Sequence, residues 1–144
     1  MAIVVKRVYE PAVGTDGARV LVDRLWPRGL SKDRAAVDHW LRDLAPSNAL
    51  RKWFHRGSGG WSDFRKRYLK ELTQREAAAA LSELYRLVDE NAKVTLLFSS
   101  KNEDHNNAVV LKELLNGMRK PPTGTGPAAA RAERKRQAKQ VPRK

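Results

Sequence analysis

The sequence contains no cysteine, which excludes disulfide bonds, thiol nucleophiles and thiolate metal sites. A chain without cysteine fits the reducing cytoplasm, and we expect a cytoplasmic protein. No apolar run approaches the roughly 20 residues that a membrane helix needs, so we expect no membrane partner. The opening MAIVVKRVYE lacks a basic segment followed by an apolar segment and a cleavage site, which predicts no secretory signal.

Acidic residues are scarce relative to basic ones, since 16 Asp and Glu stand against 29 Lys and Arg and give a formal net charge of +13. The excess is concentrated at the end of the chain. There, residues 120–144 hold eight Lys or Arg against Glu133 alone and carry +7, which leaves +6 for residues 1–119. Residues 119–144 also contain Pro, Gly and Ala without any core-forming pattern, which predicts a disordered basic tail.

The other residues, 1–118, suffice for one domain, and a hydrophobic content of 41% over the whole chain, with four Trp, can form a core. Three short apolar runs predict strands. Helix-like spacing separates these runs, so we predict an α/β fold with a mostly parallel sheet flanked by helices. The predicted strands are 3–8, 19–23 and 93–98.

Apolar spacing predicts helices in the segments between and after the strands. Residues 31–44 have the pattern of one or two short helices, and Ser47 can cap a helix that follows. The stretch 61–91 is periodic, and a break near Thr73 leaves either two helices or one long one. The last helix is predicted over 105–118.

The sequence ARVLVDRLWPRGLSKD, at 18–33, joins a buried strand to a charged loop. Asp23 and Arg24 follow the strand directly, and Gly29 permits backbone angles that other residues resist. Ser31 can then cap a helix. Open α/β sheets place ligand sites where a strand runs into such a loop, so we predict a site here.

The predicted strand 93–98 also ends in polar residues, in the sequence SSKNEDHNN. If the two strands are parallel neighbours, their carboxyl ends meet at one edge of the sheet and bring both polar segments together. We predict a pocket there in which basic side chains hold a phosphate or carboxylate. The predicted substrate-binding residues are Arg24, Trp26, Arg28, Ser99, Ser100, Lys101 and Asn106, and the candidates for proton transfer are Asp23 and His105.

Each candidate also has a purely structural interpretation. Asp23 can pair with Arg24 or accept loop N–H groups, and Trp26 can be a core aromatic that covers the loop. His105 can bond locally at a helix start, with Asp104 as the cap of that helix. A metal site from His105 with Asp23, Glu103 and Asp104 is conceivable, but no metal-binding spacing supports it, so no metal and no cofactor are expected.

Several segments together resemble one protein family. They are KRVYEP at 6–11, VLVDRLWPRGLSK at 20–32, APS at 45–47 with LRKWF at 50–54, and TLLFSSKNEDHNNAVVL at 95–111. Over about residues 3–115 the chain resembles the YeaO-like branch of a bacterial family, domain of unknown function 488. The resemblance implies a small cytoplasmic α/β domain and no particular reaction. More distant relatives carry a Cys-His-Arg-like motif where this chain reads SKNEDHNN, so cysteine-dependent chemistry does not transfer.

Three functions stay open at this point. The first is a pocket at the strand ends that binds or transforms a small anionic ligand. The second is a nucleic-acid accessory protein, which uses residues 120–144 and the basic body for sequence-independent phosphate contacts. The third is a partner-binding module without chemistry. We rank the pocket first for the domain and nucleic-acid contact first for the tail.

Overall fold

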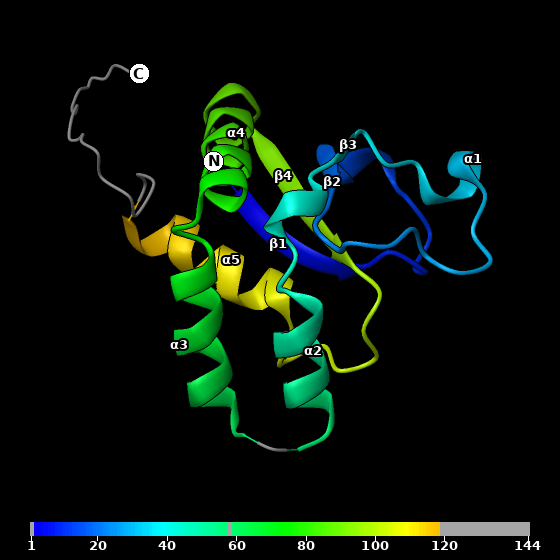
Figure 1. Cartoon of the computed structure of the whole chain (residues 1–144). Coiled ribbons are helices and arrows are strands. Elements are labelled where there is room, and N and C mark those ends of the chain that lie inside the picture. The colour runs from blue at the N-terminus through cyan, green and yellow to red at the C-terminus, as the bar shows by residue number, and fades with distance from the viewer. Residues whose placement is uncertain (1, 58, 119–144) are drawn as a thin grey trace.

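Within residues 2–57 and 59–118, which a computed structural model describes, four parallel strands form one sheet in the order β1-β4-β2-β3 (Figure 1). The strands are β1 (Ala2–Arg7), β2 (Ala18–Leu21), β3 (His39–Trp40) and β4 (Lys93–Phe98). The prediction of a parallel α/β sheet with strands near 3–8, 19–23 and 93–98 is confirmed. The predicted tail, residues 119–144, lies outside the described residues.

Strand β4 occupies a central position, although it comes last in the sequence. Val5 of β1 and Val20 of β2 both align with Leu96 of β4, one on each side. The carboxyl ends of β2 and β4 therefore lie side by side at one edge of the sheet, as the predicted pocket requires.

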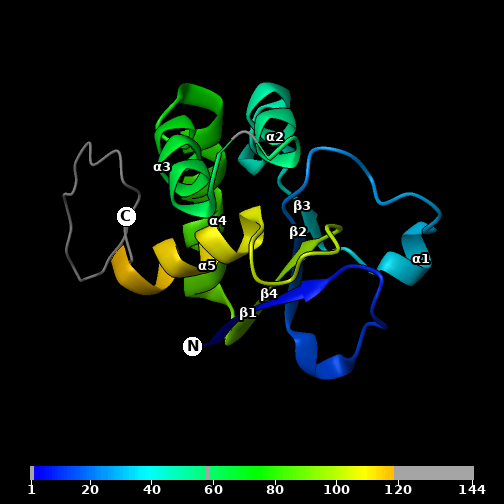
Figure 2. The ribbon, with the colours of Figure 1, turned by 90° about the horizontal axis from the view of Figure 1, so that it is seen from below.

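Both faces of the sheet are buried. Side chains alternate along a strand, so Val20 and Leu96 enter the main core under the helices, while Leu21 and Leu97 enter a smaller cluster on the opposite face. The helices are α1 (Lys32–Ala35), α2 (Asn48–His55), α3 (Trp61–Glu71), α4 (Arg75–Glu90) and α5 (Asn107–Met118). Helix α1 stands apart from the other helices beside this smaller cluster, and α2 to α5 lie on the other side (Figure 2). In the described ranges, no helix is both long and apolar enough to cross a membrane.

The helix predictions hold except in the segment 31–44. The periodic stretch 61–91 forms two helices, α3 and α4, with the expected break between them. In 31–44, α1 ends after four residues because Ala36 adopts a left-handed backbone (φ 49°). The chain beyond it is extended and pairs with β2 as β3, followed by a 3-10 helix, Arg42–Leu44. The prediction of helix across 36–41 was therefore wrong.

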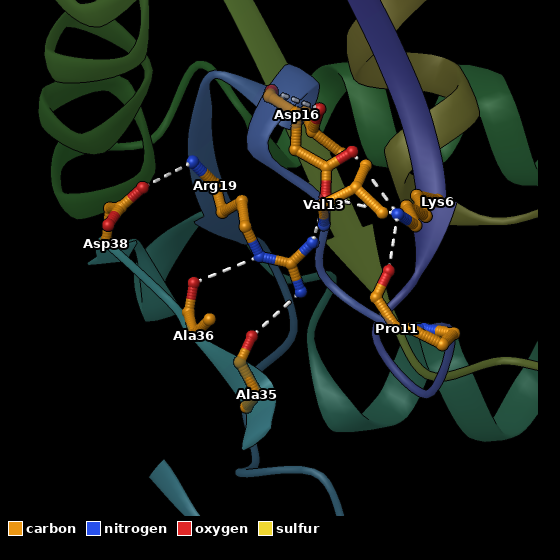
Figure 3. A network of polar contacts seen from close by, with 9 residues as sticks. Lys6, Pro11, Val13, Asp16, Arg19, Ala35, Ala36 and Asp38 are labelled. Atoms are coloured by element: carbon orange, nitrogen blue, oxygen red, sulfur yellow. Dashed lines mark hydrogen bonds and ion pairs between the residues drawn. The ribbon is translucent and has the colours of Figure 1, made fainter. Parts of the chain in front are cut away.

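A buried ion pair lies at the amino end of β2, away from the predicted pocket. Asp16 and Arg19 are almost fully buried, and Arg19 Nη1 lies 2.5 Å from the carboxylate of Asp16 (Figure 3). Lys6 Nζ approaches the same carboxylate at 3.1 Å. The remaining guanidinium N–H groups of Arg19 donate to the carbonyls of Ala35 (2.8 Å) and Ala36 (3.0 Å). This network ties the first strand, the start of β2 and the end of α1 together.

Candidate functional site

A cavity of about 450 Å³ lies beyond the carboxyl ends of β2 and β4. It is bordered by the segments that follow these two strands, by helix α2 and by the start of α5, which lie at the same end of the molecule in Figure 1. The volume falls within the range of about 300–1,000 Å³ that small-molecule sites occupy. The cavity is lined by Asp23, Arg24, Leu25, Ala45, Pro46, Asn48, Arg51, Phe54, His55, Phe64, Ser99, Ser100, Asn102, His105, Asn106 and Asn107.

Most of the residues predicted for the site border this cavity. They come from two segments more than 70 positions apart, and the pairing of β2 with β4 brings these segments together. The residues are Asp23, Arg24, Ser99, Ser100, His105 and Asn106.

The other predicted binding residues, Trp26, Arg28 and Lys101, are not part of the cavity lining. Trp26 packs edge-on against Trp40, with ring centroids 5.4 Å apart, and donates its indole N–H to the Leu30 carbonyl at 2.8 Å. The structure thus supports the interpretation of Trp26 as a core aromatic that covers the loop. The side chains of Arg28 and Lys101 are exposed.

Asp23 joins three elements through its side chain. Oδ2 accepts the backbone N–H and the hydroxyl of Ser99, both at 2.8 Å, and Oδ1 accepts Nδ2–H of Asn107 at 3.1 Å. These bonds hold the ends of β2 and β4 and the first residue of α5 against one another. Asp23 forms no ion pair with Arg24, so of the two structural interpretations the acceptor of loop N–H groups is the one observed.

The loop after β4 is positioned by residues on both sides of it. Arg7, at the end of β1, donates Nε–H to the carbonyl of Ser100 (2.9 Å) and Nη2–H to that of Ser99 (3.2 Å). At the other end of the loop, Asn106 Oδ1 accepts the backbone N–H of Val109 at 3.0 Å and so caps α5. The expectation that Asp104 caps this helix was wrong. Arg7 was missed because its sequence position, inside a strand, carries no loop signal.

Two arginines that line the cavity, Arg24 after β2 and Arg51 on α2, have unused donors. Arg24 Nη2 makes one long hydrogen bond, 3.4 Å, to the Ala45 carbonyl. Arg51 makes no side-chain hydrogen bond or ion pair within the described part of the chain, and it is exposed. Neither guanidinium has a carboxylate partner among the described residues. The one carboxylate in the cavity lining is that of Asp23, and it accepts hydrogen bonds from Ser99 and Asn107 instead. The cavity therefore offers positive charge that the described fold leaves uncompensated.

Helix α2 contributes residues that the sequence did not identify as site residues. Asn48, Arg51 and His55 have the spacing i, i+3 and i+7, which places them on one helix face, and all three line the cavity. The imidazole of His55 is exposed at the border of the cavity. The one available signal was Ser47, whose hydroxyl caps α2 as predicted by accepting the Leu50 N–H at 3.1 Å.

The two candidates for proton transfer do not form a catalytic pair in this structure. Asp23 and His105 share the cavity but no hydrogen bond joins them, and the imidazole of His105 is stacked on Trp61 instead. Among the residues that the structure describes, no group of three or more His, Cys, Asp or Glu side chains could hold a metal ion.

Comparison with known proteins finds relatives of similar length. The chain is 46% identical to "Uncharacterized protein YeaO" of Escherichia coli (strain K12) over 120 residues, which cover 82% of this chain and 100% of that protein. "Uncharacterized protein Rv3073c" of Mycobacterium tuberculosis (strain ATCC 25618 / H37Rv) is 42% identical over 113 residues, 78% of this chain and 92% of the relative. No solved structure matches the chain significantly.

A family model described as "Inactive DUF488-N3 subclade" matches residues 2–129. This range contains every residue of the cavity, and it ends later than residue 115, where the sequence resemblance was expected to end. Together with the similarity to YeaO, the match confirms the resemblance to YeaO-like proteins. The chain therefore belongs to the DUF488-N3i family, the inactive DUF488-N3 subclade.

Proposed function

We propose that this protein binds a small molecule with a phosphate or carboxylate group in the cavity beyond β2 and β4. One observation carries this function: Arg24 and Arg51 border the same cavity, and neither has a carboxylate partner among the described residues. A guanidinium forms strong charge-assisted hydrogen bonds with phosphate and carboxylate oxygens. An anion held between these two side chains would use the donors that the fold leaves free.

The amide side chains of the lining add neutral donors around the same space. Asn48, at the start of α2, is exposed to the cavity, and its side chain makes no hydrogen bond with another described residue. A mixed set of guanidinium and amide donors is suited to an oxyanion with several acceptor oxygens.

The proposed function is binding without turnover. The matched family is described as inactive. The carboxylate oxygens of Asp23 already accept hydrogen bonds from Ser99 and Asn107, which leaves this side chain with a positioning role. A general base is normally oriented by a hydrogen-bonded partner, and the ring of His105 has none in the described part of the chain. Catalysis by Asp23 and His105 stays a prediction that a turnover assay can test.

Isothermal titration calorimetry with inorganic phosphate and with acetate, on the full chain at low salt, tests this function. We expect Arg51→Gln and Arg24→Gln each to weaken phosphate binding by roughly tenfold or more, because a hydrogen bond to a charged group contributes about 1.5–3 kcal/mol. Lys52→Gln is the matched control, since Lys52 is exposed on the same helix but does not line the cavity.

A variant of Arg28 provides the result that would overturn the proposed site. Arg28 was predicted from sequence to bind the anion, but it lies outside the cavity lining. Loss of phosphate binding in Arg28→Gln, with normal binding in Arg51→Gln, would place the anion elsewhere and overturn the proposed site. Equal losses in Arg51→Gln and Lys52→Gln would indicate general attraction to a basic surface and would overturn it as well.

A further inference from the structure

A row of aromatic rings runs beside the cavity, from α2 through α3 to the loop after β4. Phe54 and Phe64 have ring centroids 4.6 Å apart, and Phe64 and Trp61 are stacked at 5.6 Å with an angle of 16° between their planes. Trp61 and the imidazole of His105 are stacked at 4.5 Å and 14°. The row thus aligns rings from three segments, and all of them except Trp61 line the cavity.

His105 is the exposed end of this row. One face of its imidazole is covered by Trp61, and no other ring contact of His105 is found among the described residues. The ring also borders the cavity that is lined by Arg24 and Arg51, neither of which has a carboxylate partner among the described residues. A second planar group could therefore continue the stack on the face of the imidazole opposite Trp61.

The volume of the cavity is larger than an anionic group needs. A phosphate group has the size of a few water molecules, each of which occupies roughly 30 Å³ in the liquid. It would leave most of the 450 Å³ empty. The lining also includes apolar side chains, among them Leu25, Pro46 and Phe54. The rest of the ligand is therefore expected to be an apolar or aromatic body.

We infer that the ligand is an aromatic or heteroaromatic ring that carries the anionic group. Its ring stacks on His105 as the next member of the row, while Arg24 and Arg51 hold the anionic group. This inference rests on the proposed function, since it specifies the ligand of the same site. Offset or parallel ring stacking favours aromatic over saturated rings of equal size, and that difference can be measured.

A pair of matched probes tests the inference on the full chain. Phenyl phosphate and cyclohexyl phosphate differ in the aromatic character of the ring, and titration calorimetry measures the affinity for each. We expect phenyl phosphate to bind roughly three- to tenfold more tightly than cyclohexyl phosphate. Benzoate and cyclohexanecarboxylate form a second pair, which shows whether the site takes an aryl phosphate or an aryl carboxylate.

Two variants assign the preference to His105. His105→Leu removes the ring and is expected to abolish the difference between phenyl and cyclohexyl phosphate. His105→Phe restores an aromatic face without the titrating nitrogens and is expected to restore the difference. Circular dichroism checks that both variants are folded.

The measurements distinguish failure of the aromatic-ligand inference from failure of the proposed anion site. Equal affinity for the phenyl and cyclohexyl probes, both weakened by Arg51→Gln, would overturn the aromatic ligand and leave the anion site intact. A preference for phenyl phosphate that persists in His105→Leu would overturn the role of His105. Absence of binding for all four probes and for inorganic phosphate would overturn both proposals.

Discussion

Individual residues in the cavity differ in how much of their hydrogen-bonding capacity the fold itself uses. Asp23 accepts three hydrogen bonds from Ser99 and Asn107, and its position is fixed by all of them. Arg51, which lines the same cavity from helix α2, makes none within the described residues. A buried charge or acceptor must be paired, whereas an exposed guanidinium with free donors remains available to a ligand. This difference separates the positioning role of Asp23 from the binding role that we propose for Arg51.

The buried carboxylate of Asp16 makes folding stability sensitive to acid. Burial by itself raises the pKa of Asp16, but hydrogen bonds from the Val13 N–H, Lys6 and Arg19, with the charge of Lys6, outweigh it and hold the pKa below its usual value. Because the folded-state pKa is depressed, the stabilisation is complete above the unfolded-state pKa of about 3.9 and is lost as the pH falls through the folded-state value.

We predict that Asp16→Asn destabilises the protein strongly at pH 7, by about 3–5 kcal/mol, because it leaves Arg19 buried without its partner. The difference in unfolding free energy between wild type and variant should shrink as the pH falls below about 4. Urea unfolding at a series of pH values measures it. Asp33→Asn is the control, since Asp33 is exposed and makes no ion pair in the described residues. A difference that stays constant down to pH 3 would contradict the prediction.

The sequence predicted the cavity residues that follow β2 and β4 but missed those on α2, because only the first set is marked by a local pattern. Asp23, Arg24 and Ser99 follow buried strands directly, and strand ends converge in any parallel sheet. The approach of Arg51 depends on how α2 packs against α3, and no local pattern specifies that packing. Trp26 lies in the predicted loop, but its side chain turns to Trp40 instead of the cavity, because β3 provides a ring for it to pack against.

Among the elements, α2 is held in place by Ser47, which caps the helix and also bonds to helix α3. The Ser47 hydroxyl accepts the Leu50 N–H and donates to Glu71 Oε2 at 2.6 Å, and the Ser47 backbone N–H donates to Glu71 Oε1 at 2.8 Å. Glu71 is the last residue of α3. One carboxylate therefore fixes the start of α2 against the end of α3, and with it the helix face that carries Arg51.

We predict that Ser47→Ala lowers the unfolding free energy by about 1–2 kcal/mol, because it removes the cap of α2 and one bond to Glu71. It should also weaken phosphate binding, since the helix that presents Arg51 loses its anchor. Thermal melting and calorimetry measure the two effects.

The control for this cap is Ser31→Ala. Ser31 also accepts a backbone N–H, that of Arg34 at 3.2 Å, but it caps the four-residue helix α1 and is exposed. We expect a smaller loss of stability and normal phosphate binding. An effect of Ser31→Ala on binding as large as that of Ser47→Ala would show that α2 has no special part in the site.

Strand β3 shows where an element could not be read from the sequence. Residues 36–41 have the apolar spacing of a helix, but Asp38 N–H bonds to the Arg19 carbonyl and Leu41 N–H to that of Leu21. The exposed edge of β2 offers these acceptors, and the left-handed turn at Ala36 directs the chain to them. Longer elements were predicted well because their patterns extend over several turns, as in α4 and α5. A two-residue strand is decided by its tertiary partner.

At the scale of the whole molecule, the distribution of charge separates the two expected functions. The cavity lies in the part of the chain that carries +6, whereas residues 120–144 carry +7. The family match ends at residue 129, so most of the basic residues of the tail lie beyond it. An anion site in the domain and phosphate contacts by the tail are therefore independent proposals, and removal of the tail should affect only one of them.

We predict that deletion of residues 120–144 leaves the midpoint of thermal unfolding nearly unchanged, because the segment has no apolar pattern to bury. Binding to a DNA or RNA duplex should become weaker, and its dependence on salt should become flatter. Each phosphate contact contributes roughly 0.9 to the slope of log affinity against log salt concentration, so the loss of eight basic residues can be seen in the slope.

The matched control keeps the length of the chain and changes only its charge. In it, all Lys and Arg of 120–144 are replaced by Gln, and binding of a duplex is measured between low and high salt beside the wild type and the deletion. If the tail binds phosphates, both variants should show the same flattened slope, while calorimetry with inorganic phosphate gives the wild-type affinity for the cavity. A salt dependence equal to that of the wild type would show that the tail does not bind nucleic acid, and would assign the phosphate contacts to residues 1–119.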